Sequence, residues 1–289
     1  MDRKVLEHIV VDGVAKTANL LCVAIKDPDL VEDEIPHARF VYRYGNEWGW
    51  MCDKKWEVVD TCISDTDEQL VVFLGEEGSL LKIGKGYTAD SSLPDVDGVY
   101  RGISFVDDTL YVCGMKNLVY QLATDEEWIK INPDGFDASF ETVSGVSNEE
   151  IYFAGWKGVI CQFNGVDWKK IDSPTNFILT CSGVTEDKKV VIAGQQGTIL
   201  IGRGEEWKVV ETEVIDDFWD VAVVGEKIYV SSMTTVYALD TEAEEKLNVV
   251  SPDGISAGKL AHSEGVLWSI GCDDVGFFDG ESWTWLDDN

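Results

Sequence analysis

Short runs of strand-forming residues recur along most of this chain, and each run is closed by a small residue and followed by a polar turn. The clearest copies are IYFAGWKGVICQFNGVDWKKID (151–172) and VVIAGQQGTILIGRGEEWKVVE (190–211), and residues 110–132 and 267–286 follow the same plan. Each copy predicts three short strands, the third beginning with Trp. No segment shows a sustained apolar period of 3.6 residues, so a helical solenoid is excluded.

The small residue that closes the first strand of each copy marks a regular period. It falls at Gly75, Gly114, Gly155, Gly194, Ser232 and Gly271, with gaps of 39, 41, 39, 38 and 39 residues. A fourth apolar run lies upstream, at 102–106, 141–146, 178–184 and 219–224. Four antiparallel strands repeated at about 40 residues are typical of a β-propeller blade. The predicted fold is therefore all-β, a single β-propeller domain over residues 1–289.

The N-terminal region decides the number of blades. Residues 70–286 hold six clear repeats, whereas 1–69 are irregular. We expect 38–45 and 48–54 to be the middle strands of a further blade, and 56–64 can merge an outer strand with the next inner strand. Residues 4–12 are expected to pair with the C-terminal blade and close the ring. The expected count is seven four-stranded blades, with six as the alternative.

Glycines in hairpin turns and glycines that close a strand have different expected roles. Asn164-Gly165 and Asp279-Gly280 predict two-residue hairpin turns, since these residues tolerate positive φ. A glycine that closes a strand is expected where the backbone bends or approaches a neighbour closely.

The motif A-G-x-x-G-x-I followed by G-x-x-W-x-x-V is seen in AGQQGTILIGRGEEWKVV and more loosely in AGWKGVICQFNGVDWKKI. It resembles the propeller repeats of the photosystem II assembly factor and of related sialidase-like families of the BNR type. The resemblance covers roughly residues 70–286 and implies the propeller fold. It implies no activity, because such repeats occur in proteins of very different roles.

Charge limits the partners. Lys and Arg number 23 against 54 Asp and Glu, a net charge of −31, which repels nucleic acid and anionic membranes. The same charge favours solubility or the steering of a basic protein.

Cysteine spacing and the N-terminal pattern bear on the compartment. The seven cysteines form no C-x-x-C pair, so we expect reduced, buried thiols. The N-terminal apolar runs are interrupted by charges, so we expect no signal peptide and a cytoplasmic location.

Motifs for catalysis or metal binding are absent from the sequence. His8, His37 and His262 stand singly, and no nucleophile elbow, phosphate-binding loop or H-E-x-x-H motif occurs. Asp95-Val96-Asp97-Gly98 and Asp273-Asp274 offer oxygens to a cation, but neither continues into an EF-hand loop. We expect no catalytic residue, no metal and no cofactor.

Loops on one face of the propeller are the expected binding surface, because loops between blades and turns between second and third strands open on the same side. There, aromatic side chains would supply affinity and carboxylates would raise the association rate. The alternative is that aromatics at the start of inner strands only cap the core. The candidate partner-binding residues are Asp95, Asp97, Tyr100, Asp134, Phe140, Trp156, Phe177, Gln195, Asp216, Asp217, Phe218 and Trp219.

A non-enzymatic, protein-binding propeller is the favoured function. The acidity suggests an immunity-type inhibitor that binds and neutralises a basic protein, such as a nuclease or a similar toxin. Two alternatives stay open: an assembly scaffold, which predicts a second apolar patch on the side of the ring, and a carbohydrate-active hydrolase with paired carboxylates, which predicts a deep carboxylate-lined pocket.

Overall fold

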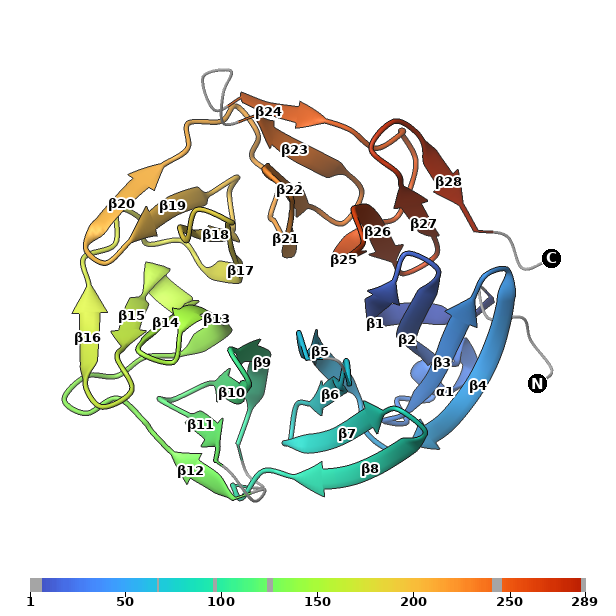
Figure 1. Cartoon of the computed structure of the whole chain (residues 1–289), viewed down its shortest axis with the longest axis horizontal. Coiled ribbons are helices and arrows are strands. Elements are labelled where there is room, and N and C mark those ends of the chain that lie inside the picture. The colour runs from blue at the N-terminus through green and yellow to red at the C-terminus, as the bar shows by residue number, and fades with distance from the viewer. Residues whose placement is uncertain (1–6, 67, 96–97, 124–126, 241–245, 287–289) are drawn as a thin grey trace.

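Seven antiparallel sheets form a closed ring in the computed structural model, which describes residues 7–66, 68–95, 98–123, 127–240 and 246–286 (Figure 1). Each sheet is one blade of four strands that follow one another from the axis of the ring outward. This confirms the all-β propeller and the count of seven blades.

The first three blades contain the only α-helix among the described residues, α1 (Pro28–Glu32), between the second and third strands of blade 1. Their strands are β1 (Ile9–Thr17), β2 (Leu20–Lys26), β3 (Ala38–Tyr44) and β4 (Glu47–Lys54) in blade 1; β5 (Val58–Ile63), β6 (Val71–Gly75), β7 (Ser79–Gly84) and β8 (Tyr87–Ser92) in blade 2; and β9 (Tyr100–Val106), β10 (Thr109–Gly114), β11 (Val119–Leu122) and β12 (Trp128–Lys130) in blade 3.

The remaining four blades follow the same order, and a short 3-10 turn, η3 (Trp156–Gly158), links the middle strands of blade 4. The strands are β13 (Phe140–Ser147), β14 (Glu150–Gly155), β15 (Ile160–Phe163) and β16 (Trp168–Ile171); β17 (Leu179–Val184), β18 (Val190–Gly194), β19 (Ile199–Arg203) and β20 (Glu206–Val209); β21 (Asp220–Val224), β22 (Lys227–Ser231), β23 (Val236–Asp240) and β24 (Lys246–Val249); and β25 (Gly258–Ser263), β26 (Val266–Gly271), β27 (Val275–Phe278) and β28 (Trp283–Trp285).

The ring closes differently from the sequence prediction. The predicted pairing of residues 4–12 with the C-terminal blade is wrong: β1 pairs with β2 as the inner strand of blade 1, and blade 7 draws all four strands from residues 258–285. Residues 4–6 of that segment lie outside the described residues. Segments 38–45 and 48–54 are the third and outer strands, and 56–64 contains only the inner strand β5.

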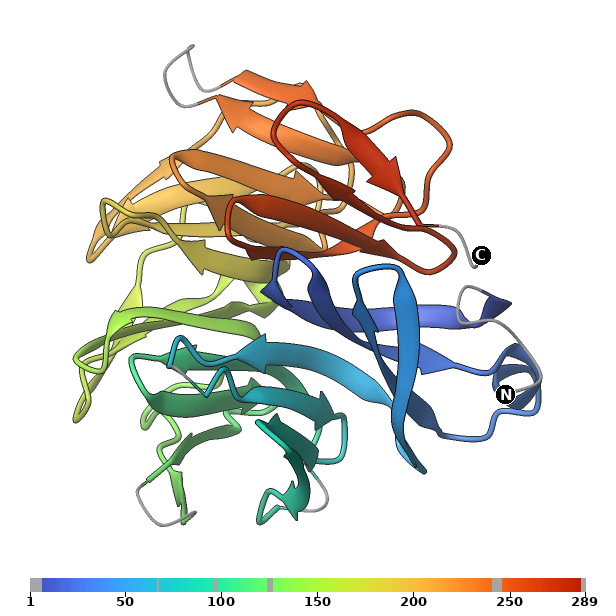
Figure 2. The ribbon, with the colours of Figure 1, turned by 45° about the vertical axis from the view of Figure 1, so that its right-hand side comes forward.

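Blades 1 and 7 lie side by side in both views and are joined mainly through packing (Figure 2). One buried apolar cluster spans the junction and includes Val10, Val23 and Trp268. The backbone N–H of Val10 also donates to the carbonyl of Cys272 at 3.0 Å. In the part of the chain that the structure describes, no strand is exchanged between the first and last blades, so closure depends mainly on side-chain burial between two complete sheets.

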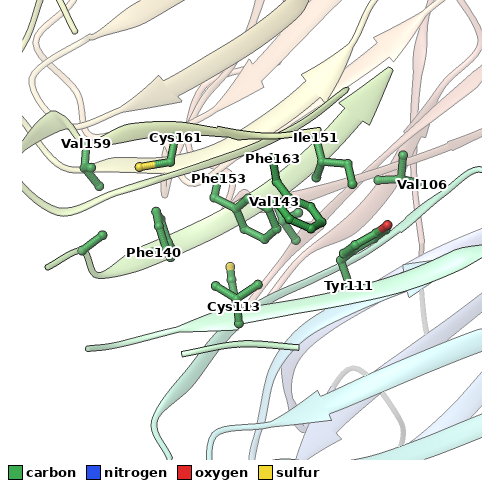
Figure 3. Close-up of a cluster of buried hydrophobic side chains, with 12 residues drawn as sticks. Val106, Tyr111, Cys113, Phe140, Val143, Ile151, Phe153, Val159, Cys161 and Phe163 are labelled. Carbon is green, nitrogen blue, oxygen red and sulfur yellow. The ribbon is translucent and has the colours of Figure 1, made fainter. Parts of the chain in front are cut away.

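Seven buried clusters of the described residues fill the seven junctions between adjacent blades. At the junction of blades 3 and 4, Phe153 and Phe163 of one sheet face Tyr111 and Cys113 of the other (Figure 3). Alternation of side chains along each strand presents apolar residues to both neighbouring blades, which explains why the middle strands are nearly all apolar. Five of the seven free cysteines are buried within these layers.

The periodic glycines stand where another backbone passes. A Cβ on Gly155 would lie 2.2 Å from the carbonyl oxygen of Ser139, and one on Gly194 would lie 2.1 Å from that of Ile178. Both carbonyls belong to the loop that enters the same blade. The expected close approach at the strand-closing glycines is confirmed at these positions, where any side chain would collide with the incoming chain.

The periodic tryptophans connect neighbouring blades. The indole N–H of Trp168 donates to the carbonyl of Ile131 at 2.6 Å, and that of Trp283 donates to the carbonyl of Val250 at 2.8 Å. In both cases the acceptor follows the outer strand of the preceding blade. Trp207 differs, because its indole donates to Gly204 in its own hairpin at 3.1 Å.

In the Asn-Gly and Asp-Gly hairpins, four residues separate the strands, so the predicted two-residue length is wrong. The predicted positive φ is confirmed at Gly165 (90°) and Gly280 (101°). In residues 164–167, Oδ1 of Asn164 accepts from the backbone N–H groups of Val166 and Asp167. Asp279 accepts from Glu281 and Ser282 in the same way. A side-chain acceptor for two backbone donors favours this longer turn.

No helix in the described ranges is long and apolar enough to cross a membrane.

Candidate protein-binding face and central channel

Loops between blades and turns between second and third strands meet on one side of the ring, here called the loop face. Backbone hydrogen bonds join the two sets: Met115 donates to Val99 at 2.8 Å, Trp156 to Ser139 at 2.9 Å, and Gln195 to Ile178 at 2.9 Å. The same link recurs at three successive blades, so the turn tips are held by the loops that enter each blade. This confirms the expected common position of the two loop classes.

Left-handed backbone conformations shape the turn tips. Lys157 and Gly158 have φ of 58° and 68°, and Gln196 and Gly197 have 56° and 67°. The sequence pattern of a long polar residue followed by glycine fits this requirement, because glycine adopts positive φ without steric cost. The turn therefore places the preceding side chain at its tip, and Trp156 there keeps 43% of its surface accessible.

Three of the candidate aromatic residues are buried and cannot contact a partner in this structure. Tyr100, Phe140 and Phe218 each have no exposed surface, and all three belong to apolar clusters between blades. Their prediction as contact residues is corrected here. They stand at the point where the chain enters a blade, and their rings point between the sheets, so the core-capping alternative holds for them.

Three other aromatic candidates are exposed on the loop face. Trp156, Phe177 and Trp219 keep 43%, 45% and 41% of their surface accessible. The indole N–H of Trp156 donates to the carboxylate of Glu141, which fixes the ring at the turn tip. Large exposed rings held in place lose little conformational entropy on binding, a property of interface anchors.

The candidate polar residues have different surroundings. Asp134 is exposed, Gln195 is half-buried, and Asp95 forms an ion pair with Lys130 at 2.6 Å. Oδ2 of Asp216 accepts from the Tyr237 hydroxyl at 2.7 Å, and Oδ1 of Asp217 accepts from the Gln196 backbone at 2.9 Å. Asp97 lies outside the described residues. Asp216 and Asp217 thus fix the conformation of their loop as well as supplying charge.

The loop face as a whole is acidic. Its described loops and turns carry carboxylates at nearly every blade, whereas their Lys and Arg residues are confined to Lys55, Lys116 and Lys157. The face that presents the exposed aromatic side chains therefore shares the negative charge of the whole chain.

A central channel opens among the inner strands and was missed by sequence reasoning. Its cavity has a volume of about 400 Å³. Four charged residues at equivalent positions of the inner strands line it: Asp12, Asp60, Asp220 and Lys259. The lining also includes Arg101, Glu141 and Trp219. Nζ of Lys259 lies 3.6 Å from Oδ2 of Asp12 and 3.4 Å from Oδ1 of Asp60. The detectable signal was an Asp after apolar residues in inner strands, as in VVD (10–12 and 58–60).

Two of the channel aspartates also hold neighbouring blades together. Oδ2 of Asp60 accepts from the backbone N–H of Ile103 on blade 3 at 2.8 Å, and Oδ2 of Asp220 accepts from that of Leu260 on blade 7 at 2.8 Å. Oδ1 of Asp12 accepts from Gly13 at 2.7 Å within its own strand. These bonds satisfy backbone donors at the axis of the ring, where adjacent inner strands do not pair.

Burial dominates the electrostatics of the channel. It raises the pKa of Asp12 to about 7 and that of Asp220 to about 6, although the charge of Lys259 acts in the opposite direction. Burial alone lowers the pKa of Lys259, but attraction by Asp12, Asp60 and Asp220 outweighs it and the pKa is raised. The ammonium therefore stays charged among carboxylates. No three His, Cys, Asp or Glu side chains of the described residues converge as metal ligands.

These features define a seven-bladed β-propeller with an acidic, aromatic loop face. The sequence matches no protein-family model. A similar solved structure is the virginiamycin B lyase of Staphylococcus aureus, with a TM-score of 0.77 and 11% sequence identity over 96% of this chain and 97% of that chain. The WD40 propeller domain of Doa1 has a TM-score of 0.72 and 15% identity over 96% of this chain and 94% of that chain. YCF48 of Cyanidioschyzon merolae, with a TM-score of 0.63 and 13% identity over 80% of this chain and 86% of that chain, confirms the resemblance to the photosystem II assembly factor at the level of fold.

A relative of much higher sequence identity places the chain in a particular family. It is 33% identical over 300 residues to the immune protein Tsi7 of Pseudomonas aeruginosa, and the match covers 96% of each chain. The chain belongs to the Tsi7 immune-protein family.

Proposed function

We propose that this protein is a non-enzymatic immunity protein that binds a basic toxin protein through the loop face and neutralises it in the cytoplasm. The observation that carries the proposal is the full-length relationship to the immune protein Tsi7. The exposed rings of Trp156, Phe177 and Trp219 support a protein partner, because such rings commonly supply most of the affinity of an interface. The seven free cysteines support a reducing compartment.

The charge of the molecule supports a basic partner. The net charge is −31, and the described loops of the loop face carry few basic side chains. A surface of one sign accelerates the encounter with a surface of the opposite sign and disfavours partners of the same sign. An acidic inhibitor would therefore select and reach a basic toxin quickly.

The test has a binding arm and a neutralisation arm. Tagged protein is used to capture partners from a lysate of its source cells at low and high salt, and each captured protein is expressed in a sensitive host with and without this chain. The proposal predicts one basic protein whose capture weakens with salt and whose toxicity is suppressed by co-expression. Toxicity that persists despite co-expression, or no specific capture at either salt, would overturn it.

A hydrolase is the second candidate, and the carboxylate-lined channel is the observation that favours it. In glycosidases two carboxylates flank the scissile bond, one as acid and one as base or nucleophile. Here, however, Lys259 lies between Asp12 and Asp60, and oxygens of Asp60 and Asp220 accept from backbone amides. Carboxylates used in this way are poorly placed to attack a substrate. Hydrolysis of a glycoside panel that Asp220→Asn abolishes would favour the hydrolase.

A further inference from the structure

The channel cluster has more negative than positive charge. Asp12, Asp60 and Asp220 surround one cation, Lys259. On the rim, Arg101 is already paired with Glu76 at 3.0 Å, and Glu141 lies beside it. The lining therefore retains negative charge in a partly enclosed space, where the effective dielectric is lower than in water and attraction of a further cation is stronger.

One acceptor in the cluster is unsatisfied. The side chain of Asp12 is 6% exposed, and its buried Oδ2 has no hydrogen-bond donor among the described residues. Lys259 approaches this oxygen only to 3.6 Å, which is beyond hydrogen-bond length. A buried carboxylate oxygen without a donor is costly, and a ligand that supplies N–H groups would remove that cost.

The cavity has room for a side chain, and an aromatic ring forms part of its wall. Its volume of about 400 Å³ is within the range of small-ligand sites. Trp219 lines it and keeps 41% of its surface accessible, so the ring lies between the channel and the loop face. Aromatic faces attract guanidinium and ammonium groups and pack against their aliphatic stems.

We propose that the central channel is a receptor for one lysine or arginine side chain of the bound protein, which enters past Trp219 toward Asp60, Asp220 and Asp12. This inference rests on the proposed function, because it requires a protein partner with a basic surface. The buried cation would act as a central anchor, and the exposed aromatics of the loop face would surround it. The three aspartates thus have a recognition role in addition to their bonds between blades.

The probe is the peptide acetyl-Gly-Arg-Gly-amide, compared with its citrulline isostere at matched ionic strength. Amide and indole resonances of Gly13, Trp219 and Leu260 are followed by NMR during titration of the full chain. The arginine peptide should shift them saturably, with a half-saturation on the order of 1 mM. The citrulline peptide, which is neutral, should bind at least about tenfold more weakly, as expected for the loss of a charge-assisted contact.

Variants assign the binding to the channel. Asp220→Asn, Asp12→Asn and Trp219→Ala should each weaken the arginine peptide by about fivefold or more, since each removes charge or packing from its path. Asp108→Asn is the matched control, because Asp108 is an exposed carboxylate in the β9–β10 turn on the opposite face and should leave binding unchanged. Dispersed spectra and a cooperative thermal transition well above the titration temperature confirm folding, and Trp219→Ala keeps the test valid if an Asn variant unfolds.

Three outcomes would overturn the inference: no saturable shift up to 50-fold above the expected half-saturation, equal binding of the arginine and citrulline peptides, or binding that persists unweakened in the channel variants. These failures are distinct from failure of the proposed function. If a toxin is captured and neutralised but the peptide does not bind, only the inference about the channel is contradicted. If the peptide binds but no captured protein is neutralised, only the proposed immunity function is contradicted.

Discussion

Adjacent residues in the loop that enters blade 6 have opposite roles. Phe218 is fully buried between blades 5 and 6, whereas 41% of the surface of Trp219 is accessible. Successive side chains of an extended chain point to opposite sides, so the residue before an inner strand and its neighbour cannot both enter the core. The position of each ring relative to the first residue of the strand thus decides its role.

This difference predicts separate effects on stability and binding. Phe218→Ala should lower the free energy of unfolding by about 3–5 kcal/mol, because it leaves a cavity in the core. Trp219→Ala should change it by less than about 1 kcal/mol but weaken partner affinity by about 2 kcal/mol, roughly thirtyfold. Urea unfolding and titration calorimetry with the captured partner measure the two quantities. An unchanged affinity in Trp219→Ala would remove this residue as an anchor.

Asp12 predicts a pH dependence of stability. Burial raises its pKa in the folded state to about 7 from an ordinary 3.8, with Asp60, Asp220 and Lys259 as its charged neighbours. The folded state therefore binds this proton more tightly, and the stability that it contributes at low pH is lost as pH rises through about 7. Because Asn cannot ionise, the stability of Asp12→Asn relative to wild type should rise as the pH increases from about 4 to about 7 and then level off.

Urea unfolding at a series of pH values measures this difference, and Asp108→Asn provides the comparison. Because Asp108 is exposed in the β9–β10 turn, its variant should differ from wild type by a nearly constant amount over the same pH interval. A constant difference for Asp12→Asn as well would contradict the predicted proton linkage.

At the scale of elements, turn and loop form one unit. In blade 5 the backbone N–H of Gly197 donates to the carbonyl of Asp216 at 2.8 Å, and that of Gln196 donates to the Asp217 carboxylate at 2.9 Å. The turn between β18 and β19 thus fixes the loop that carries Trp219. Changes in the turn should therefore reach the exposed aromatic side chain.

Two glycines test this coupling. A Cβ on Gly197 (φ +67°) would lie 1.8 Å from the carbonyl oxygen of Val214, whereas Gly204 (φ +59°) has nothing within 4 Å. Gly204→Ala should cost about 1–2 kcal/mol for the left-handed backbone alone. Gly197→Ala should cost at least about 2 kcal/mol more, because the loop must move away, and should also weaken partner binding. Equal losses of unfolding free energy in the two variants would exclude the close approach.

Elements were predictable where residues near in sequence determine them. Alternating apolar runs, the strand-closing Gly155 and Gly194, and the Trp-led outer strands all report local backbone and packing requirements. Blade 1 was misassigned because Leu20–Lys26 ends without the small-residue marker, and a strand's own pattern does not specify its partner. The channel was missed because Asp12, Asp60 and Lys259 are distant in sequence and meet only when the ring closes.

The whole molecule depends on the junction of blades 1 and 7. Trp268 is buried in the cluster that joins them, and the Arg43 guanidinium lies 5.9 Å from the centre of its ring. Trp268→Ala should reduce the free energy of unfolding by about 3–5 kcal/mol. Hydrogen exchange should accelerate first in blades 1 and 7, since no strand among the described residues is exchanged between them. Uniform acceleration around the ring would show that this junction is no weaker than the others.

The acidity of the molecule predicts how association responds to salt. If the loop face steers a basic partner, the association rate should fall by about tenfold or more between 20 and 500 mM salt, as the screening length shrinks from roughly 20 Å to roughly 4 Å. The dissociation rate should change much less, because it depends mainly on the buried aromatic contacts. Stopped-flow mixing with the captured partner measures both rates.

Paired neutralisations locate the steering charge. Asp134→Asn with Asp253→Asn removes two exposed carboxylates from the loop face, whereas Asp108→Asn with Glu149→Gln removes two from the opposite face at the same cost in net charge. Steering by the loop face predicts a severalfold slower association for the first pair at low salt and little change for the second. Equal slowing would mean that the total charge of the ring attracts the partner, and that the loop face acts only after encounter.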